Sequence, residues 1–197
     1  MYRSVIINLL GKNVDESKQI INSIIDKYNF QISNDGTIWI ITENYLKNNC
    51  LIFSSFIIAE NINNYKLRNV ILVPNFKTKK EGVFFSNNIF EILFFSKNNH
   101  YYFNKDPIRE RHIWKDVEWG KRAKNYHKLG KDPGNVWLKT EDDGKGNIIK
   151  HISVSFKESI ERIIKSTTEE NDRCLLININ ENFDNIFQGV EIDNVNA

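Results

Sequence analysis

The order of apolar and polar residues along this chain follows two periods. Short runs that are apolar at nearly every position predict buried strands, and apolar residues spaced three and four apart predict helices with one buried face. We expect strands at residues 5–10, 37–42, 67–73, 90–95, 174–179 and 188–192, and helices at 15–28, 50–60 and 156–166. Asp15 or its neighbour is expected to cap the first helix, and Pro74 to end the third strand. Strands alternating with helices indicate an α/β fold with a mainly parallel sheet.

The polar stretches between these elements predict turns and one long insertion. Residues 34–36 are expected to form a turn, and residues 97–99 a turn that leads into a hairpin with 101–103. Residues 105–150 show no clear period and hold three of the four tryptophans and two of the three prolines. Such a composition is typical of an elaborated loop region or a small subdomain. The 197 residues suffice for one medium domain.

Charge is unevenly distributed, although the net charge is only +2. Residues 105–131 carry nine Lys or Arg against four Asp or Glu, whereas residues 166–197 carry one Arg against seven Asp or Glu. A basic middle and an acidic end indicate one face that meets a polyanion. Scatter of charges over a solvated surface explains the same numbers and stays open at this point.

Several classes of function and location are excluded or made unexpected by the composition. Cys50 and Cys174 are far apart in apolar runs, and we expect both to be buried free thiols in a reducing cytoplasm. No apolar run approaches the roughly eighteen residues of a membrane span, and residues 1–4 do not begin a signal peptide. The sequence has no Walker loop, GxGxxG or GxSxG motif. Its four histidines lack metal-ligand spacing, so we expect no metal site.

One segment carries a more specific pattern. Residues 128–137, Lys-Leu-Gly-Lys-Asp-Pro-Gly-Asn-Val-Trp, resemble the GK-x-P-x-x-VW element near the end of the target-recognition region of the DNA adenine-N6/cytosine-N4 methyltransferases. Other segments resemble strands and helices of that family in the order of its permuted (β-type) class. These segments are residues 34–40, 67–75, 92–97, 101–104, 156–166 and 188–193.

The resemblance implies a fold and a division of the chain. It implies a Rossmann-like methyltransferase sheet flanked by helices, with an inserted loop-rich target-recognition region. Residues 1–104 and 151–197 correspond to the methyltransferase-like α/β core, and residues 105–150 to the segment that faces DNA.

The sequence departs from the family where its first predicted strand ends. The family carries [Asp/Asn/Ser]-Pro-Pro-[Tyr/Phe/Trp] there, whose polar group accepts hydrogen bonds from the target amino group and whose ring stacks on the flipped base. Here the positions are Asn8, Leu9, Leu10 and Gly11. Asn8 could supply the acceptor, but no ring is present. Stacking on an aromatic ring contributes about 1–3 kcal/mol per base, which is similar to the few kcal/mol that base flipping costs.

The methyl-donor motif and a third motif also depart from the family. The family's Asp-Pro-Phe-x-Gly-Ser-Gly is replaced from Asn178 by Asn-Ile-Asn-Glu, and no glycine follows until Gly189. Glycines let the backbone approach a nucleotide closely, so side chains here are expected to obstruct S-adenosylmethionine. The cofactor-binding positions that remain are Asn178 and Glu191. The family's His-Glu before the hairpin falls on Ile89 and Phe90.

The resemblance makes residues 105–150 the DNA-facing segment, and its basic residues are candidates for phosphate contacts. The candidate DNA-binding residues are Arg109, Arg111, Trp114, Lys115, Trp119, Lys121, Arg122, Lys124, Lys128 and Lys131. Trp114 and Trp119 either pack on bases or sugars or form a small core, and Trp137 is expected in the core. A basic loop at residues 77–80 is a weaker candidate, and a solvated turn explains it equally well.

Three hypotheses follow. The first is a non-catalytic methyltransferase-like protein that binds double-stranded DNA, pairs with an active methyltransferase as a homo- or heteromer, and has no cofactor alone. The second is a divergent but active adenine-N6 or cytosine-N4 methyltransferase that uses S-adenosylmethionine. The third is a decayed or repurposed protein-interaction module. All three imply a cytoplasmic protein without a membrane segment.

Overall fold

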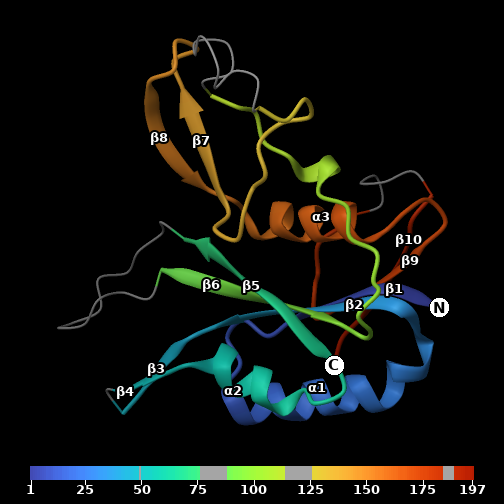
Figure 1. Ribbon diagram of the computed structural model, residues 1–197. Coiled ribbons are helices and arrows are strands. Elements are labelled where there is room, and N and C mark those ends of the chain that lie inside the picture. Colours follow the sequence, from blue (N-terminus) through green and yellow to red (C-terminus); the bar gives the residue numbers. More distant parts are fainter. Residues whose placement is uncertain (49, 76–87, 114–125, 184–188) are drawn as a thin grey trace.

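A six-stranded sheet lies between helices on its two faces in the computed structural model (Figure 1). The structure describes residues 1–48, 50–75, 88–113, 126–183 and 189–197, and the statements below concern these residues. The sheet order is β10-β9-β1-β2-β6-β5. Its strands are β1 (Tyr2–Asn8), β2 (Ile32–Glu43), β5 (Lys66–Pro74), β6 (Ile89–Ser96), β9 (Arg173–Ile177) and β10 (Glu191–Val195).

Strand direction confirms the predicted mainly parallel sheet. β10, β9, β1 and β2 pair in parallel, and β6 is antiparallel to both of its neighbours. The parallel centre is buried on both faces, which explains why β1, β2 and β9 read as nearly continuous apolar runs.

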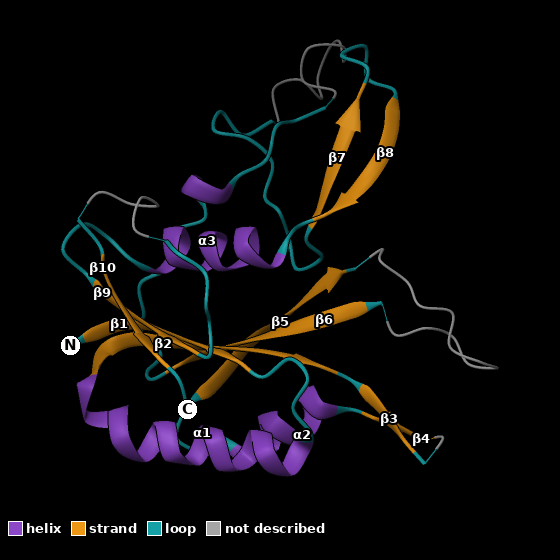
Figure 2. Ribbon diagram, turned by 180° about the vertical axis from the view of Figure 1, so that it is seen from behind, coloured by secondary structure: helices purple, strands orange, loops and turns teal. Residues whose placement is uncertain are grey.

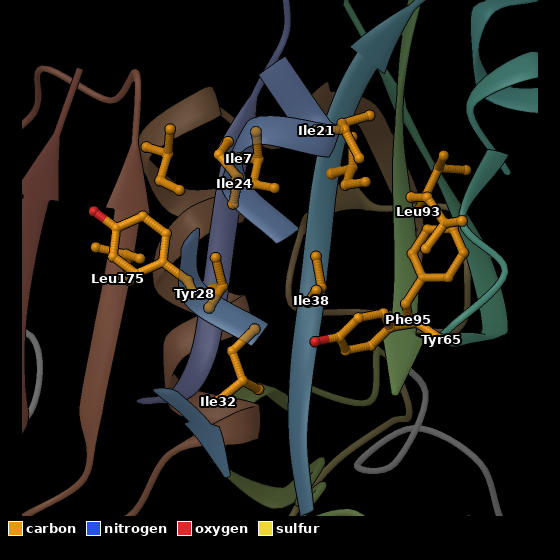
Figure 3. Close-up of a cluster of buried hydrophobic side chains, with 14 of the residues drawn as sticks. Ile7, Ile21, Ile24, Tyr28, Ile32, Ile38, Tyr65, Leu93, Phe95 and Leu175 are labelled. Atoms are coloured by element: carbon orange, nitrogen blue, oxygen red, sulfur yellow. The ribbon is translucent and has the colours of Figure 1, made fainter. Parts of the chain in front are cut away.

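Helices cover both faces of the sheet. α1 (Val14–Tyr28) and α2 (Ser54–Asn61) pack on one face, and α3 (Phe156–Thr167) packs on the other (Figures 1 and 2). Because side chains alternate along a strand, β2 sends Ile38 and Ile40 into one core and Trp39 and Ile41 into the other. Figure 3 shows Ile21, Ile24 and Tyr28 of α1 packed over the first of these cores. The expected flanked α/β fold is therefore confirmed.

The first helix begins slightly earlier than expected. Its cap is Asn13 and not Asp15, because Asn13 Oδ1 accepts a hydrogen bond from the Glu16 N–H (3.0 Å). The Glu16 carboxylate in turn accepts from the Asn13 N–H (3.1 Å), which completes a capping box.

Three local predictions were wrong. Residues 34–36 lie inside β2, where its register with β1 shifts, rather than in a turn. Residues 50–52 form β4 (Cys50–Ile52), paired with β3 (Tyr45–Lys47), so the helix starts only at Ser54. Residues 101–103 form no strand, because Tyr101 and Phe103 pack against Phe94 on the sheet instead.

Cysteine exposure and the insertion complete the description. Cys174 is buried as expected, whereas Cys50 is exposed because β4 lies in a two-stranded hairpin outside the main sheet. The insertion, residues 105–150, contains a short 3-10 turn, η2 (Asp106–Ile108), and most of a hairpin. The two strands of the hairpin, β7 (Leu138–Asp142) and β8 (Ile148–Ser153), stand above α3 (Figure 1). A further 3-10 turn, η1 (Asn29–Gln31), follows α1. Within the described residues, no helix is long and apolar enough to cross a membrane.

Candidate functional site

The carboxyl ends of the parallel strands meet at one edge of the sheet, where ligands of open α/β folds bind. Asn8 ends β1 at this edge, beside Asn178 after β9. Asn8 Nδ2 donates to the Asn178 carbonyl oxygen (3.1 Å), and Asn8 Oδ1 accepts from the Leu10 N–H (3.1 Å). Both the oxygen and the nitrogen of the Asn8 amide are thus hydrogen-bonded within the protein.

The segment after Asn8 is tied to β2. Leu9 is fully buried, and its N–H donates to the Ile41 carbonyl oxygen (2.8 Å). The Gly11 N–H donates to Glu43 Oε1 (3.0 Å). Backbone hydrogen bonds and a buried leucine therefore shape this loop, in place of the two prolines of the family motif.

On the other side of the edge, hydrogen bonds and buried apolar side chains fix the segment that follows β9. Asn178 has φ 57°, a conformation that asparagine tolerates better than most residues. Its N–H donates to the Val195 carbonyl oxygen and its Oδ1 accepts from the Ala197 N–H, both at 2.9 Å. The side chains of Ile179 and Phe183 are buried in the core. A cavity of about 370 Å³, lined by residues 179–182 and 194–196, lies next to these contacts, so space remains at this edge although the family's glycines are absent.

The two candidate cofactor-binding residues do not form one site. Glu191 begins β10 and pairs with Arg173 at the start of β9 (3.3 Å), with its side chain 73% exposed. Asn178 lies just beyond the other end of β9. About five residues of strand, roughly 17 Å, separate them. The sequence could not reveal this, because it does not give the register between β9 and β10.

A cavity of about 700 Å³ lies beside Leu10 at the same edge. Apolar and polar side chains from the loop after β1, from β5, β6 and β8, and from the turn into α3 surround it. Its lining residues are Leu10, Pro74, Asn75, Phe90, Lys150, His151, Ile152, Ser153, Val154, Ser155 and Phe156. The rings of Phe90 and Phe156 lie 6.4 Å apart. Sequence reasoning placed Leu10 and Phe90 at degenerate motif positions and Phe156 in an amphipathic helix, and it did not bring them together as the lining of one cavity.

The element at residues 128–137 is a folded clasp on the core. Glu110 and Lys131 exchange backbone hydrogen bonds (2.9 and 2.6 Å). The Leu72 N–H of β5 donates to the Asn135 carbonyl oxygen (2.8 Å), and the Trp137 N–H donates to the Leu72 carbonyl oxygen (2.9 Å). Trp137 is 3% exposed, as expected for a core residue. The clasp therefore extends the β5 edge of the sheet.

A buried arginine of α3 joins this clasp to the core. Arg162, 7% exposed, lies 2.9 Å from Glu110 and 3.3 Å from Glu158. Its guanidinium also lies over the Trp137 ring, 5.5 Å from the ring centroid. Sequence reasoning read Arg162 only as part of an amphipathic helix.

Comparison with known proteins identifies the family of this chain. A model of the DNA methylase family, which covers N6 and N4 methyltransferases, matches residues 11–175. The chain belongs to the DNA methylase family. The family resemblance expected from residues 128–137 and the other segments is thereby confirmed.

Solved DNA methylases share the fold of this family member at low sequence identity. The PvuII cytosine-N4-specific DNA methyltransferase has a TM-score of 0.62 and 12% identity, with 98% of this chain and 75% of that chain covered. The M1.HpyAVI–SAM complex has a TM-score of 0.50 and 16% identity, covering 98% and 82%. The putative DNA modification methylase TTHA0409 of Thermus thermophilus, complexed with S-adenosyl-L-methionine, has a TM-score of 0.52 and 10% identity, covering 96% and 79%. No curated protein matches the chain.

The candidate DNA contacts of this DNA methylase family member differ in how accessible they are. Arg111, Lys128 and Lys131 are exposed. Arg111 lies 3.5 Å from Asp142 with its side chain 62% exposed. Arg109 is tied to the clasp from outside it, since it donates to the Gly130 carbonyl oxygen (3.3 Å) as well as to Asp106 Oδ1 (2.6 Å).

The other candidates fall outside the described residues. They are Trp114, Lys115, Trp119, Lys121, Arg122 and Lys124, together with the basic loop at 77–80. Among the residues that the structure describes, no group of three or more His, Cys, Asp or Glu is placed to hold a metal ion.

Proposed function

We propose that this member of the DNA methylase family is a non-catalytic methyltransferase-like protein that binds double-stranded DNA and works with an active DNA amino-methyltransferase. The hydrogen bonding of the Asn8 amide carries the proposal. Its oxygen accepts from the Leu10 N–H, and its nitrogen donates to the Asn178 carbonyl oxygen. An acceptor for a target amino group has to present its oxygen to the base. Here the side chain holds two strand ends together.

The described residues do not offer S-adenosylmethionine the glycine-rich loop of the family, although a cavity of about 370 Å³ lies beside residues 179–182. The backbone at Asn178 is covered by its bonds to Val195 and Ala197, and Ile179 fills the core beside it. The acidic candidate Glu191 lies at the opposite end of the strands. We therefore derive no methyl-transfer step from this site.

DNA binding in the proposal rests on the exposed basic residues around the clasp. Arg111 and Lys131 adjoin the Glu110–Lys131 backbone pair, and Lys128 precedes it, so the three exposed side chains come from one small region. Phosphate contacts by Arg and Lys supply most non-specific DNA affinity. The division into a core at 1–104 and 151–197 and a DNA-facing segment at 105–150 belongs to this proposal.

An active, divergent methyltransferase is the second candidate function. The cavity of about 700 Å³ beside Leu10 favours it, because that volume lies within the 300–1,000 Å³ or so of small-ligand pockets. Asn8 Oδ1 also has a second lone pair that the Leu10 N–H does not use.

Calorimetric titration of S-adenosylmethionine into the full chain separates the two functions. We expect no binding heat from the protein alone or with a duplex, and no methyl transfer from labelled donor to DNA. The same protein should bind a duplex at low salt and co-purify with an active amino-methyltransferase in a mixed complex.

Two kinds of result would contradict the first proposal. Micromolar donor binding, or label incorporated into DNA by the chain alone, would put the active enzyme first. A clean monomer without duplex affinity at low salt would remove the DNA-binding proposal and leave a protein-interaction module.

A further inference from the structure

A second cavity, of about 470 Å³, opens on the α3 side of the sheet near the start of β5. Asn69 of β5 lines it, whereas Pro74 and Asn75 line the cavity beside Leu10. The nearest β5 residues of the two cavities are Ile71 and Pro74, three residues or roughly 10 Å apart, and the two cavities share no lining residue. The second cavity is therefore a separate site, away from the edge that carries Asn8.

Aromatic rings form the floor of this second cavity. Trp39 and Phe94 stack in parallel, with their centroids 4.0 Å apart and 5° between the ring planes. Tyr101 and Phe103 each lie 5.4 Å from the Phe94 ring, and both remain partly exposed. Partly exposed aromatic side chains that line a cavity offer rings against which a planar ligand can pack.

A held guanidinium lies at the mouth of the cavity. Arg68 lies over the Tyr101 ring, 5.1 Å from its centroid. Its Nε donates to Ser96 Oγ (2.7 Å) and its Nη2 to the Asn98 carbonyl oxygen (2.9 Å). Nη1 has no hydrogen-bond partner within the part of the chain that the structure describes. The side chain is thus fixed in place and keeps one donor edge available.

A second cation stands at the same mouth. Lys105 Nζ lies 2.5 Å from Asp132 Oδ2, and both side chains are about half exposed. The hydrogen bond from Lys105 lowers the pKa of the Asp132 carboxyl, which favours the carboxylate form of Asp132. The mouth carries two cations and one carboxylate, a balance that favours an anionic group.

We propose that this second cavity binds a nucleotide, with the base against Tyr101 and Phe103 and the phosphate at Arg68. A ligand that has both a planar ring and an anion matches an aromatic floor below a held guanidinium. A free mononucleotide and an unstacked nucleotide of a strand share this chemistry. The proposal does not rest on duplex binding, because Arg111, Lys128 and Lys131 do not line the cavity.

Titration of deoxyadenosine monophosphate into the full chain tests the proposal. Trp39 and Trp137 line the cavity, so saturable quenching of tryptophan fluorescence should accompany the binding heat. Deoxyadenosine should bind about tenfold more weakly or worse, because it lacks the charge-assisted contact to Arg68. A six-residue single strand of deoxyadenosine is titrated in parallel.

Variants assign the site. Arg68→Met should weaken the nucleotide about tenfold or more, and Arg68→Lys should fall between Met and the native residue because it keeps the charge without the planar fork. Tyr101→Leu should weaken it about fivefold or more through lost stacking. Lys18→Met on α1 and Phe30→Leu, whose ring is 85% exposed, serve as controls and should leave binding unchanged.

Each outcome decides the proposal. Binding of the mononucleotide supports a free-nucleotide site, and binding of the strand alone with the same variant dependence supports a site for an unstacked nucleotide. Absence of saturable binding by either, equal binding of nucleotide and nucleoside, or binding unchanged in folded Arg68 and Tyr101 variants overturns it. Selective binding of an aromatic peptide in place of both nucleotide forms also overturns it.

Discussion

Gly130 and Gly134 lie four residues apart in the clasp, and both have positive φ angles, +118° and +69°. A Cβ at Gly130 would lie 2.5 Å from the Glu110 carbonyl oxygen, whereas a Cβ at Gly134 would meet nothing within 4 Å. Gly130 is therefore required for both its conformation and its close contact. Gly134 is required for its conformation alone.

Replacing each of these glycines by alanine separates the two causes. We expect Gly134→Ala to lower the free energy of unfolding by about 1 kcal/mol, the cost of a left-handed residue. Gly130→Ala should lower it by about 3 kcal/mol, because overpacking adds to that cost. Urea denaturation of both variants measures the difference. Equal losses would contradict the close contact with Glu110.

Arg162 offers a second test with single residues. Arg162→Met leaves the Glu110 carboxylate without its buried partner, whereas Glu158 keeps Lys139 at 2.5 Å, and we expect a loss of about 3 kcal/mol. Lys150→Met is the matched control, since the Lys150–Glu141 pair is about half exposed and should contribute about 0.5 kcal/mol or less. Thermal and urea unfolding give both values. A small loss at Arg162 would show that the buried pair does not hold the clasp to α3.

At the scale of elements, Tyr65 connects the end of α1 with the start of β5. Its side chain is 4% exposed, and its hydroxyl donates to Asn29 Oδ1 at 2.8 Å. Burial raises the pKa of the Tyr65 hydroxyl from 10.0 to about 12. The contact between these two elements therefore depends on the tyrosine being neutral.

This pKa predicts a pH dependence of stability. The stabilising contribution of Tyr65 is fully present below about pH 10, the unfolded pKa. It is lost as the pH rises toward about 12, because the unfolded state then binds fewer protons than the folded state. Tyr65→Phe should lose about 1 kcal/mol at neutral pH through the missing hydrogen bond, and its stability should fall less steeply between these two pH values. Identical alkaline slopes for both proteins would rule out Tyr65 as the source.

At the scale of the whole molecule, the exposed basic residues and the acidic end of the chain occupy different parts of the fold. Arg111, Lys128 and Lys131 lie in the insertion beyond α3, whereas the acidic residues 166–197 include β9 and β10 at one edge of the sheet. In our proposal, the insertion binds DNA. Helix α1 lies on the far face of the sheet and does not contact DNA.

The salt dependence of duplex binding tests this arrangement. The triple change of Arg111, Lys128 and Lys131 to Ala should reduce the slope of log affinity against log salt by about 2.7, because each phosphate contact contributes about 0.9. Lys18→Ala with Lys27→Ala, both on α1, is the control and should leave the slope unchanged. Fluorescence anisotropy over a series of salt concentrations gives the slopes. An unchanged slope in the triple variant would place the DNA contacts elsewhere.

The sequence by itself determined the elements that bury one continuous apolar surface. The strands around Val5, Ile38 and Leu175 and the helices α1 and α3 follow from local periodicity, because each repeats its apolar residues at the period of its own backbone. The family was also readable from residues 128–137, because Gly130, Pro133 and Trp137 have the spacing of the family's element.

Tertiary structure decided whatever depends on residues far apart in the chain. The register of β10 against β9 places Asn178 and Glu191 at opposite ends, and the Asn8–Asn178 bond closes the sheet edge. Tyr101 leaves its expected hairpin because Phe94 offers it a ring to pack against. Local sequence cannot give such outcomes, because the free energy of each contact belongs to a pair of surfaces and appears only when folding brings both together.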